Sequence, residues 1–208
     1  MDYYHNLVTE KSWKELQNLR RRLDFTLIGG WATYIYAKTL KSKDIDIIVD
    51  YDTLPVLTKL YDLSKNDRLK KYQAANDEVE IDIYLPHYSK IGIPVEDLMG
   101  KTRVVEGFTV VDPDYLCALK LYVLGERGRT PKGRKDFLDI LSLFLSSLID
   151  AAVVSALITR YHLEASRDIL VDFLSESQEI PELALSTHRY AKVKREIVEA
   201  VSPSRFFS

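Results

Sequence analysis

The sequence predicts an α+β fold, in which a small mixed β-sheet flanked by helices is followed by a C-terminal helical bundle. Between residues 25 and 111, short strand-like runs alternate with helical segments, which is typical of a mixed sheet with helices. From residue 113 onward, apolar residues recur at helical spacing only. This change of pattern predicts two domains, an α+β domain over residues 1–112 and a helical domain over residues 113–208.

The segments that lead into the sheet are an amphipathic helix and a strand-to-helix turn. Residues 10–22 carry apolar side chains at helical spacing among charged ones, which predicts a helix. Residues 25–28 form a β-like run that ends at Gly29-Gly30, and residues 31–40 contain neither glycine nor proline. The two glycines therefore predict a tight turn between a strand and a helix.

Two further strands carry acidic residues. Residues 44–49 alternate with period 2, so Asp44 and Asp46 are expected on one face of a strand. Residues 78–85 form another alternating run, which contains Asp82. A helix is expected at 53–63 and a strand at 68–72, and a turn at 76–77 would join that strand to the one at 78–85. A hairpin at 101–111 is expected to turn at Glu106-Gly107. Helices are expected at 114–126, at 132–147 and onward to about residue 201.

Composition and charge place the chain among ordinary globular proteins. Hydrophobic residues at 46% favour a packed core over disorder, and a net charge of −2 provides no global field for tight binding to a polyanion. The only cysteine, Cys117, excludes an intramolecular disulfide, and a reducing compartment is expected. The N-terminal residues lack the pattern of a signal peptide and charges interrupt the longest apolar region, so a cytoplasmic protein without a membrane span is expected.

Several other chemistries have no support in the sequence. The four histidines are scattered without metal-ligand spacing, which argues against zinc, and neither a Ser-His-Asp arrangement nor a P-loop is present. Five cations lie between Arg127 and Lys135 in a chain that is near neutral as a whole. They are equally consistent with a patch that steers a triphosphate or an RNA and with a solvated helix entrance.

The pair Asp44 and Asp46 has the spacing of a metal site. Carboxylates two residues apart on a strand leave the same face about 6 to 7 Å apart, and they repel unless a cation lies between them. Mg²⁺ suits this arrangement because it binds a few carboxylate oxygens and keeps its other positions for water and substrate phosphates. Asp82 supplies a third carboxylate, and the turn at Gly29-Gly30 would let backbone N–H groups approach phosphate oxygens. Taken singly, each feature also fits a solvated acidic pair or a plain tight turn.

A family resemblance rests on the same residues. The stretch Gly29-Gly30-Trp31-Ala32, followed by Asp44-Ile45-Asp46 and by Asp82, resembles the nucleotidyltransferase superfamily built on the DNA polymerase β-like fold. Its opening looks like that of small antibiotic nucleotidyltransferases, although Tyr34 stands where those enzymes tend to carry aspartate. The resemblance implies that Asp82 activates the acceptor hydroxyl. It also implies that Asp44, Asp46 and Asp82 bind the metal ion, Mg²⁺ or Mn²⁺. The residues implied to contact the nucleotide are Gly29, Gly30, Thr33 and Lys43.

A second resemblance lies downstream. The segment with Asp114-Tyr115-Leu116, Lys120, Arg127 and Lys135-Asp136-Phe137-Leu138-Asp139 looks like the AbiEii-type toxin nucleotidyltransferases. It implies that Lys120 is a catalytic residue that contacts the nucleotide phosphates, and that Asp136 orients Lys120 or the bound base. The helical domain would then complete the nucleotide site of a catalytic domain formed by residues 1–112.

Together these features predict an enzyme that transfers a nucleoside monophosphate from a nucleoside triphosphate to an acceptor hydroxyl. The toxin-like resemblance suggests an RNA, tRNA or protein acceptor, with an antitoxin protein as a further partner. A small-molecule, antibiotic-type nucleotidyltransferase and a non-catalytic nucleotide-binding regulatory module stay open as alternatives.

Overall fold

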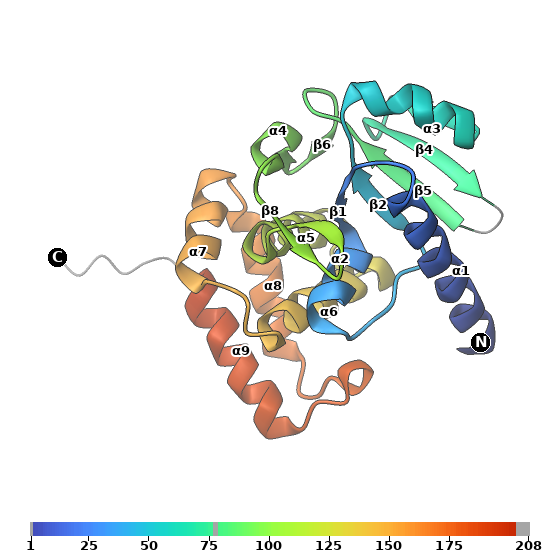
Figure 1. Ribbon diagram of the computed structural model, residues 1–208. Coiled ribbons are helices and arrows are strands. Elements are labelled where there is room, and N and C mark those ends of the chain that lie inside the picture. The colour runs from blue at the N-terminus through green and yellow to red at the C-terminus, as the bar shows by residue number, and fades with distance from the viewer. Residues whose placement is uncertain (1, 77–78, 203–208) are drawn as a thin grey trace. The chain divides into compact units, whose positions relative to one another are not determined.

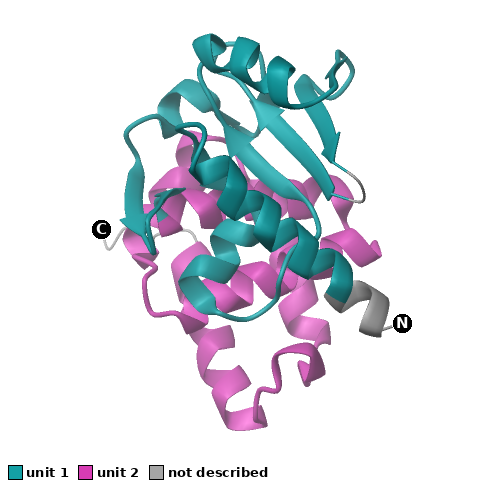
Figure 2. Ribbon diagram, turned by 45° about the vertical axis from the view of Figure 1, so that its right-hand side comes forward, with its two compact units in different colours: residues 1–112 teal, residues 113–208 magenta. Residues whose placement is uncertain are grey.

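The structure is a computed structural model that describes residues 2–76 and 79–202 of the chain. The chain groups into two compact units that divide between Asp112 and Pro113, and Figure 2 shows them in different colours. Residues 77–78 lie outside the described part. The turn predicted at 76–77 therefore lies partly outside the described residues, and residue 78, the predicted start of the next strand, lies outside them.

Unit 1, residues 1–112, is built on a mixed β-sheet (Figure 1). Its strands among the described residues are β1 (Thr26–Ile28), β2 (Ile45–Ile48), β3 (Leu63–Asn66), β4 (Lys71–Asn76), β5 (Val79–Tyr84), β8 (Thr102–Val105) and β9 (Phe108–Val111). They follow the order β3-β4-β5-β2-β1-β9-β8. β2 runs parallel to β5, and β1 runs parallel to β9, while the other neighbours are antiparallel.

Helices accompany this sheet in unit 1. They are α1 (Asp2–Arg20), α2 (Gly29–Ala37), the 3-10 turn η1 (Tyr51–Thr53), α3 (Leu54–Leu60) and α4 (Val95–Leu98), and the short strands β6 (Lys90–Ile91) and β7 (Ile93–Pro94) pair separately. α1 contacts β5, and α2 contacts both β1 and β2. The central strands therefore receive helical cover from the N-terminal part of the chain.

Buried isoleucines set the register of the two central strands. Ile45 and Ile47 of β2 and Ile81 and Ile83 of β5 are fully buried, and they pair directly across the parallel ladder. Each fully buried isoleucine stabilises the fold by roughly 1.5 to 3 kcal/mol relative to an exposed one. A slip of one residue would expose all four and bury Asp46, so the isoleucines keep the acidic side chains on the opposite face.

The segment after α3 differs from the prediction. The helix predicted at 53–63 ends at Leu60. The strand predicted at 68–72 begins only at Lys71, because residues 67–70 form a turn between β3 and β4. The Asn66 side chain accepts a hydrogen bond from the Leu69 backbone N–H at 3.0 Å, which closes this turn locally. The short elements between residues 90 and 98 carry no clear period in the sequence and escape the prediction.

The hairpin predicted at 101–111 is confirmed. β8 and β9 pair antiparallel with Val105 opposite Phe108, and the two residues between them have positive φ angles, 51° at Glu106 and 77° at Gly107. A two-residue turn of this kind matches the twist of the strands, and glycine adopts the second conformation without strain.

Unit 2, residues 113–208, consists of helices in its described part (Figure 1). They are α5 (Pro113–Arg127), α6 (Pro131–Leu145), α7 (Ala151–Arg160), α8 (Glu164–Glu176), the 3-10 turn η2 (Pro181–Leu183) and α9 (Thr187–Val201). Thr130 caps α6 by accepting a hydrogen bond from the Gly133 N–H, and Phe137 stacks on Phe173 with ring centroids 5.1 Å apart. A mixed sheet with helices, followed by helices alone, confirms the predicted α+β class. Among the described residues, no helix is both long and apolar enough to cross a membrane.

Candidate active site

Two acidic side chains meet on the sheet face opposite the buried isoleucines. Asp46 on β2 pairs directly with Asp82 on β5 in the parallel ladder, so their Cα atoms are neighbours on strands that lie about 4.8 Å apart. Both residues are partly buried. Tyr84, two residues after Asp82, donates a hydrogen bond from its hydroxyl to Oδ1 of Asp46 at 3.4 Å. β2 and β5 thus gather two carboxylates and a phenol on one surface.

The first residue of α2 lies directly against Asp46. Gly29 has a φ of 71°, a left-handed conformation that glycine adopts readily. A Cβ at this position would lie 2.1 Å from Oδ2 of Asp46. Only a residue without a side chain therefore allows the carboxylate to approach the N-terminus of α2, where the helix dipole favours negative charge. Ile28 at the N-cap has no side-chain acceptor, so its side chain does not cap the first N–H groups of α2.

Replacing Gly29 by alanine is expected to destabilise the protein by about 2 to 4 kcal/mol, because left-handed strain adds to the steric conflict at Asp46. Urea unfolding measures the loss. Gly100→Ala is the matched control, since Gly100 has a φ of 78° but no described atom lies within 4 Å of the position of its Cβ. The control is expected to lose about 1 to 2 kcal/mol. Equal losses in the two variants would contradict the close approach of Gly29 and Asp46.

Asp82 is held by side chains of the neighbouring strands. Nζ of Lys71 lies 2.5 Å from Oδ2 of Asp82, and the Gln73 amide donates a hydrogen bond to Oδ1 at 3.1 Å. Both residues belong to β4, on which Gln73 pairs with Asp82. Asn66 on β3 donates to Oε1 of Gln73 at 2.9 Å, which orients the amide. Sequence reasoning missed these three residues, because a strand predicted to end at residue 72 hides the alternation of Lys71 and Gln73.

The other residues predicted for the site in unit 1 are more dispersed. Asp44 lies just before β2 rather than within it, and it is exposed, as is Lys43. Thr33 is fully buried, and its hydroxyl donates a hydrogen bond to the Gly29 carbonyl oxygen at 3.2 Å. Gly30 is the buried second residue of α2. Thr33 therefore supports the first turn of α2 from within the helix.

The donor set of this surface suits a hard divalent cation. Asp46 and Asp82 offer carboxylate oxygens from adjacent strands, and Asp44 adds an exposed carboxylate two residues before Asp46. Mg²⁺ prefers oxygen ligands of this kind. Among the side chains that the structure describes, in residues 7–76 and 79–202, no group of three or more His, Cys, Asp or Glu has the geometry of a metal site. The Lys71 ammonium stands in as a cation at Asp82, which shows that this surface attracts positive charge.

Unit 2 holds a buried ion cluster formed by Lys120, Asp136 and Asp139. Nζ of Lys120 lies 3.2 Å from Oδ1 of Asp136 and 2.7 Å from Oδ2 of Asp139. Nη1 of Arg127 lies 2.6 Å from Oδ2 of Asp136. The Lys120 side chain is only 9% exposed, and the two carboxylates are exposed by 2% or less. The structure therefore brings Lys120 and Asp136 together, while their contacts with a nucleotide stay predictions.

Asp139 is the member of this cluster to which the sequence analysis assigned no role. Neither of its oxygens accepts a hydrogen bond of good geometry from a described residue, although Oδ2 makes the ion pair with Lys120. Burial raises the pKa of the Asp139 carboxyl, and the Lys120 ammonium offsets this rise only in part. In the sequence, Asp139 could be recognised as a partner in the site because it is a charged residue within an otherwise apolar stretch. It lies three positions after Asp136, on the same face of the helix.

The arginines near the start of α6 have acidic partners within unit 2. Arg129 pairs with Glu176 on α8, and Arg134 pairs with Glu182 on η2 at 2.9 Å. These pairs join the beginning of α6 to later parts of the same unit. For these two arginines the structure therefore favours a structural role over a patch that steers an anionic ligand.

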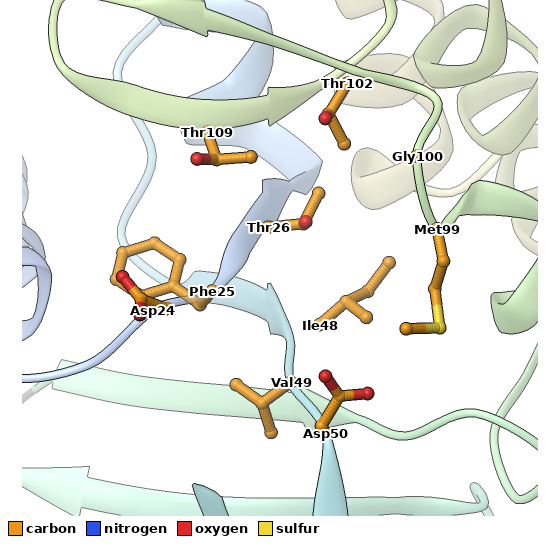
Figure 3. Close-up of a pocket in the computed structure, with 10 residues that line it drawn as sticks. All are labelled: Asp24, Phe25, Thr26, Ile48, Val49, Asp50, Met99, Gly100, Thr102 and Thr109. Atoms are coloured by element: carbon orange, nitrogen blue, oxygen red, sulfur yellow. The ribbon is translucent and has the colours of Figure 1, made fainter.

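A cavity of about 290 Å³ opens on unit 1 (Figure 3). Its lining comes from the beginning of β1, the end of β2, Thr109 of β9, and the three residues Met99, Gly100 and Thr102. Thr26 pairs with Ile48 across β1 and β2, and Ile48 lies two residues after Asp46, so the cavity and Asp46 share a face of the sheet. The lining includes three threonines and the carboxylates of Asp24 and Asp50, and its described residues include no lysine or arginine.

Comparison with solved structures identifies this fold. The antibiotic-resistance factor ANT(2'')-Ia matches with a TM-score of 0.53 and 16% identity, over 83% of this chain and 97% of that chain. JHP933 from Helicobacter pylori matches with a TM-score of 0.50 and 15% identity, over 93% of each chain. An antigenic nucleotidyltransferase-like protein from Paracoccidioides brasiliensis matches with a TM-score of 0.50 and 15% identity, over 90% of this chain and 92% of that chain. No protein-family model and no curated protein matches the sequence.

A polyadenylate synthase of Megavirus is also similar, with a TM-score of 0.49 and 16% identity, and this chain covers 32% of its length. The matches to ANT(2'')-Ia, JHP933 and the Paracoccidioides brasiliensis protein, which have TM-scores of 0.50 or more, show that the chain shares the fold of these proteins. They confirm the fold that the family resemblance at Gly29-Gly30 and Asp44-Ile45-Asp46 implied. At this level of identity, the likeness establishes the fold.

Proposed function

We propose that the chain is a Mg²⁺-dependent nucleotidyltransferase, which transfers a nucleoside monophosphate from a nucleoside triphosphate to an acceptor hydroxyl. The observation that carries this proposal is the direct pairing of Asp46 with Asp82 beside the N-terminus of α2. When bound there, Mg²⁺ or Mn²⁺ would supply positive charge for the triphosphate and for the attacking and leaving oxygens.

The residues of the chain would bind and orient the reactants. Asp44, Asp46 and Asp82 would hold the metal, and Asp82 would also orient the acceptor hydroxyl and accept its proton. Gly29 and Gly30 would present backbone N–H groups at the N-terminus of α2 to the triphosphate. Further nucleotide contacts are proposed for Lys43, Lys120 and Asp136, with Thr33 supporting the turn at Gly29.

The cavity beside Ile48 bears on the choice of acceptor. Its lining supplies hydroxyls and two carboxylates, and its described residues include no cation. Such a surface repels the phosphates of a nucleic acid but accepts a neutral or cationic group that carries a hydroxyl. For an acceptor that enters this cavity, the lining favours a protein side chain or a small molecule. An RNA or tRNA acceptor and an antitoxin partner stay predictions from the toxin-like resemblance.

Incubation with α-labelled triphosphates, Mg²⁺ and a cell lysate distinguishes these acceptors. A labelled product that protease destroys would identify a protein acceptor, and label in the low-molecular-weight fraction would identify a small molecule. A labelled product that ribonuclease destroys would identify RNA and would contradict the argument from the cavity.

Metal together with nucleotide is expected to raise the melting temperature of the protein. A ligand at 100 times its dissociation constant contributes about 2.7 kcal/mol by mass action. Proteins of this size shift by roughly 2 to 4 °C per kcal/mol, so the expected rise is about 5 to 11 °C. Calorimetry with Mg²⁺ and a non-hydrolysable triphosphate measures the shift, and Asp46→Asn is expected to lose its metal-dependent part. An equal shift in the presence of EDTA, without any transfer, would favour the non-catalytic regulatory module.

A further inference from the structure

The side chains around Asp82 form a connected polar network across three strands. Asn66 on β3 donates to Gln73 on β4 at 2.9 Å, and Gln73 donates to Oδ1 of Asp82 on β5 at 3.1 Å. Lys71 on β4 approaches Oδ2 of Asp82 at 2.5 Å. Both oxygens of Asp82 therefore have partners, on the same sheet face that carries Asp46.

The pair formed by Lys71 and Asp82 is shielded from solvent. The two side chains are 13% and 15% exposed. Exposed ion pairs contribute little, but charges in a shielded place interact more strongly and are costly when one partner is removed. Asp46 lies on the adjacent strand, so the Asp82 carboxylate has a second carboxylate as its neighbour. If Lys71 were removed, β4 would supply no cation to offset the repulsion between the two carboxylates. The Lys71 ammonium compensates this repulsion.

We propose that Lys71 is an internal counter-ion, which occupies the cation position at Asp82 until a divalent ion binds there. Gln73, oriented by Asn66, keeps the Asp82 carboxylate in place during the exchange. This inference rests on the proposed function, because it assumes a metal site at Asp46 and Asp82. Metal binding requires Nζ of Lys71 to leave Oδ2, while Gln73 retains its bond to Oδ1. Lys71 is thus a positioning residue with two effects. It opposes binding of the divalent ion alone, because the ion must displace the ammonium from Asp82. It favours binding of the ion together with a triphosphate, because the negative charge of the triphosphate attracts the displaced ammonium.

Titration calorimetry with Mn²⁺ alone, without nucleotide, tests this exchange. Lys71→Met is expected to bind Mn²⁺ about tenfold more tightly than the native protein, since no internal cation competes for Asp82. Lys71→Arg keeps the charge and is expected to stay within about twofold of the native affinity. Lys65→Met is the matched control, because Lys65 pairs with Tyr72 and lies on the opposite face of the sheet from Asp82. It is also expected to stay within about twofold.

Melting temperature provides a second readout. Without metal, Lys71→Met is expected to melt below the native protein, and saturating Mn²⁺ is expected to remove most of this difference. Should Lys71→Met not fold, Lys71→Gln offers the same comparison with a neutral side chain that can still donate to Asp82. A metal-free melting temperature that is unchanged in the variant would contradict the role of Lys71 as a counter-ion.

The outcomes separate this inference from the proposed function. If Asp46→Asn abolishes Mn²⁺ binding, but the native protein and Lys71→Met bind Mn²⁺ equally well, the role of Lys71 is overturned. The proposed function then remains intact. Mn²⁺ binding that Asp46→Asn does not affect overturns the metal site, and the inference with it.

Discussion

Asp46→Asn is expected to lower the rate of nucleotidyl transfer by about 10²- to 10³-fold, which is the usual loss when one preorganised electrostatic group is removed from an active site. The substitution keeps the size of the side chain and removes the charge that lies beside Gly29 and Asp82. Stability is expected to change little, because Asp46 lies on the sheet face opposite the buried isoleucines. Label transfer measures the rate, and circular dichroism confirms the fold.

Asp52→Asn is the matched control for this prediction. It makes the same chemical change at an exposed residue of η1, so the native rate is expected. Transfer by Asp46→Asn at more than a tenth of the native rate would contradict its role in the metal site. A loss of the circular dichroism signal would assign Asp46 a structural role instead.

Lys120→Met is expected to destabilise unit 2 by about 3 to 5 kcal/mol. The substitution leaves the carboxylates of Asp136 and Asp139 buried, and removal of one partner from a buried ion pair typically has this effect. Urea unfolding followed by far-ultraviolet circular dichroism reports on the helices. Both tryptophans, Trp13 and Trp31, lie in unit 1, so their fluorescence follows that unit separately.

Two variants accompany this measurement. Lys132→Met removes an exposed lysine from the same region and is expected to change stability by less than about 0.5 kcal/mol.

Burial raises the folded-state pKa of Asp139 above its unfolded value. The ionised form of Asp139 therefore lowers the free energy of unfolding above that pKa, and this loss declines as pH falls through the pKa. Asp139→Asn is therefore expected to lose far less stability at neutral pH than Lys120→Met. Equal losses in these two variants would contradict the direction of this pKa shift.

The sequence predicts those parts of the site that lie on regular strands. Asp46 and Asp82 could each be placed on the face of its own strand opposite the isoleucines, because period-2 alternation is a local pattern, whereas their common site was implied by the family resemblance. Gly29 could be recognised as a turn residue because the strand-like run ends there. Its contact with Asp46 depends on the pairing of β1 with β2, which no local pattern contains.

The parts that escaped prediction depend on contacts between segments. Lys71 and Gln73 reach Asp82 only because β4 pairs with β5, and the turn closed by Asn66 shifts the start of β4 to Lys71, three residues after the predicted start of that strand. Asp139 reads as an interruption of an apolar helix until α5 places Lys120 beside it. In each case a polar residue acquires its partner from another element, and sequence spacing contains no information about that pairing.

The proposed reaction is attack by an acceptor hydroxyl on the α-phosphate of a nucleoside triphosphate, with pyrophosphate as the leaving group. Parallel incubations with α-labelled and γ-labelled triphosphate, each with Mg²⁺ or EDTA and a lysate as the source of acceptor, test it most directly. We expect the α-label on an acceptor and the γ-label in pyrophosphate, only with Mg²⁺, and we expect Asp46→Asn to lower both by about 10²- to 10³-fold. A γ-label on the acceptor, a γ-label released as free phosphate without α-transfer, or transfer that persists in EDTA would contradict it.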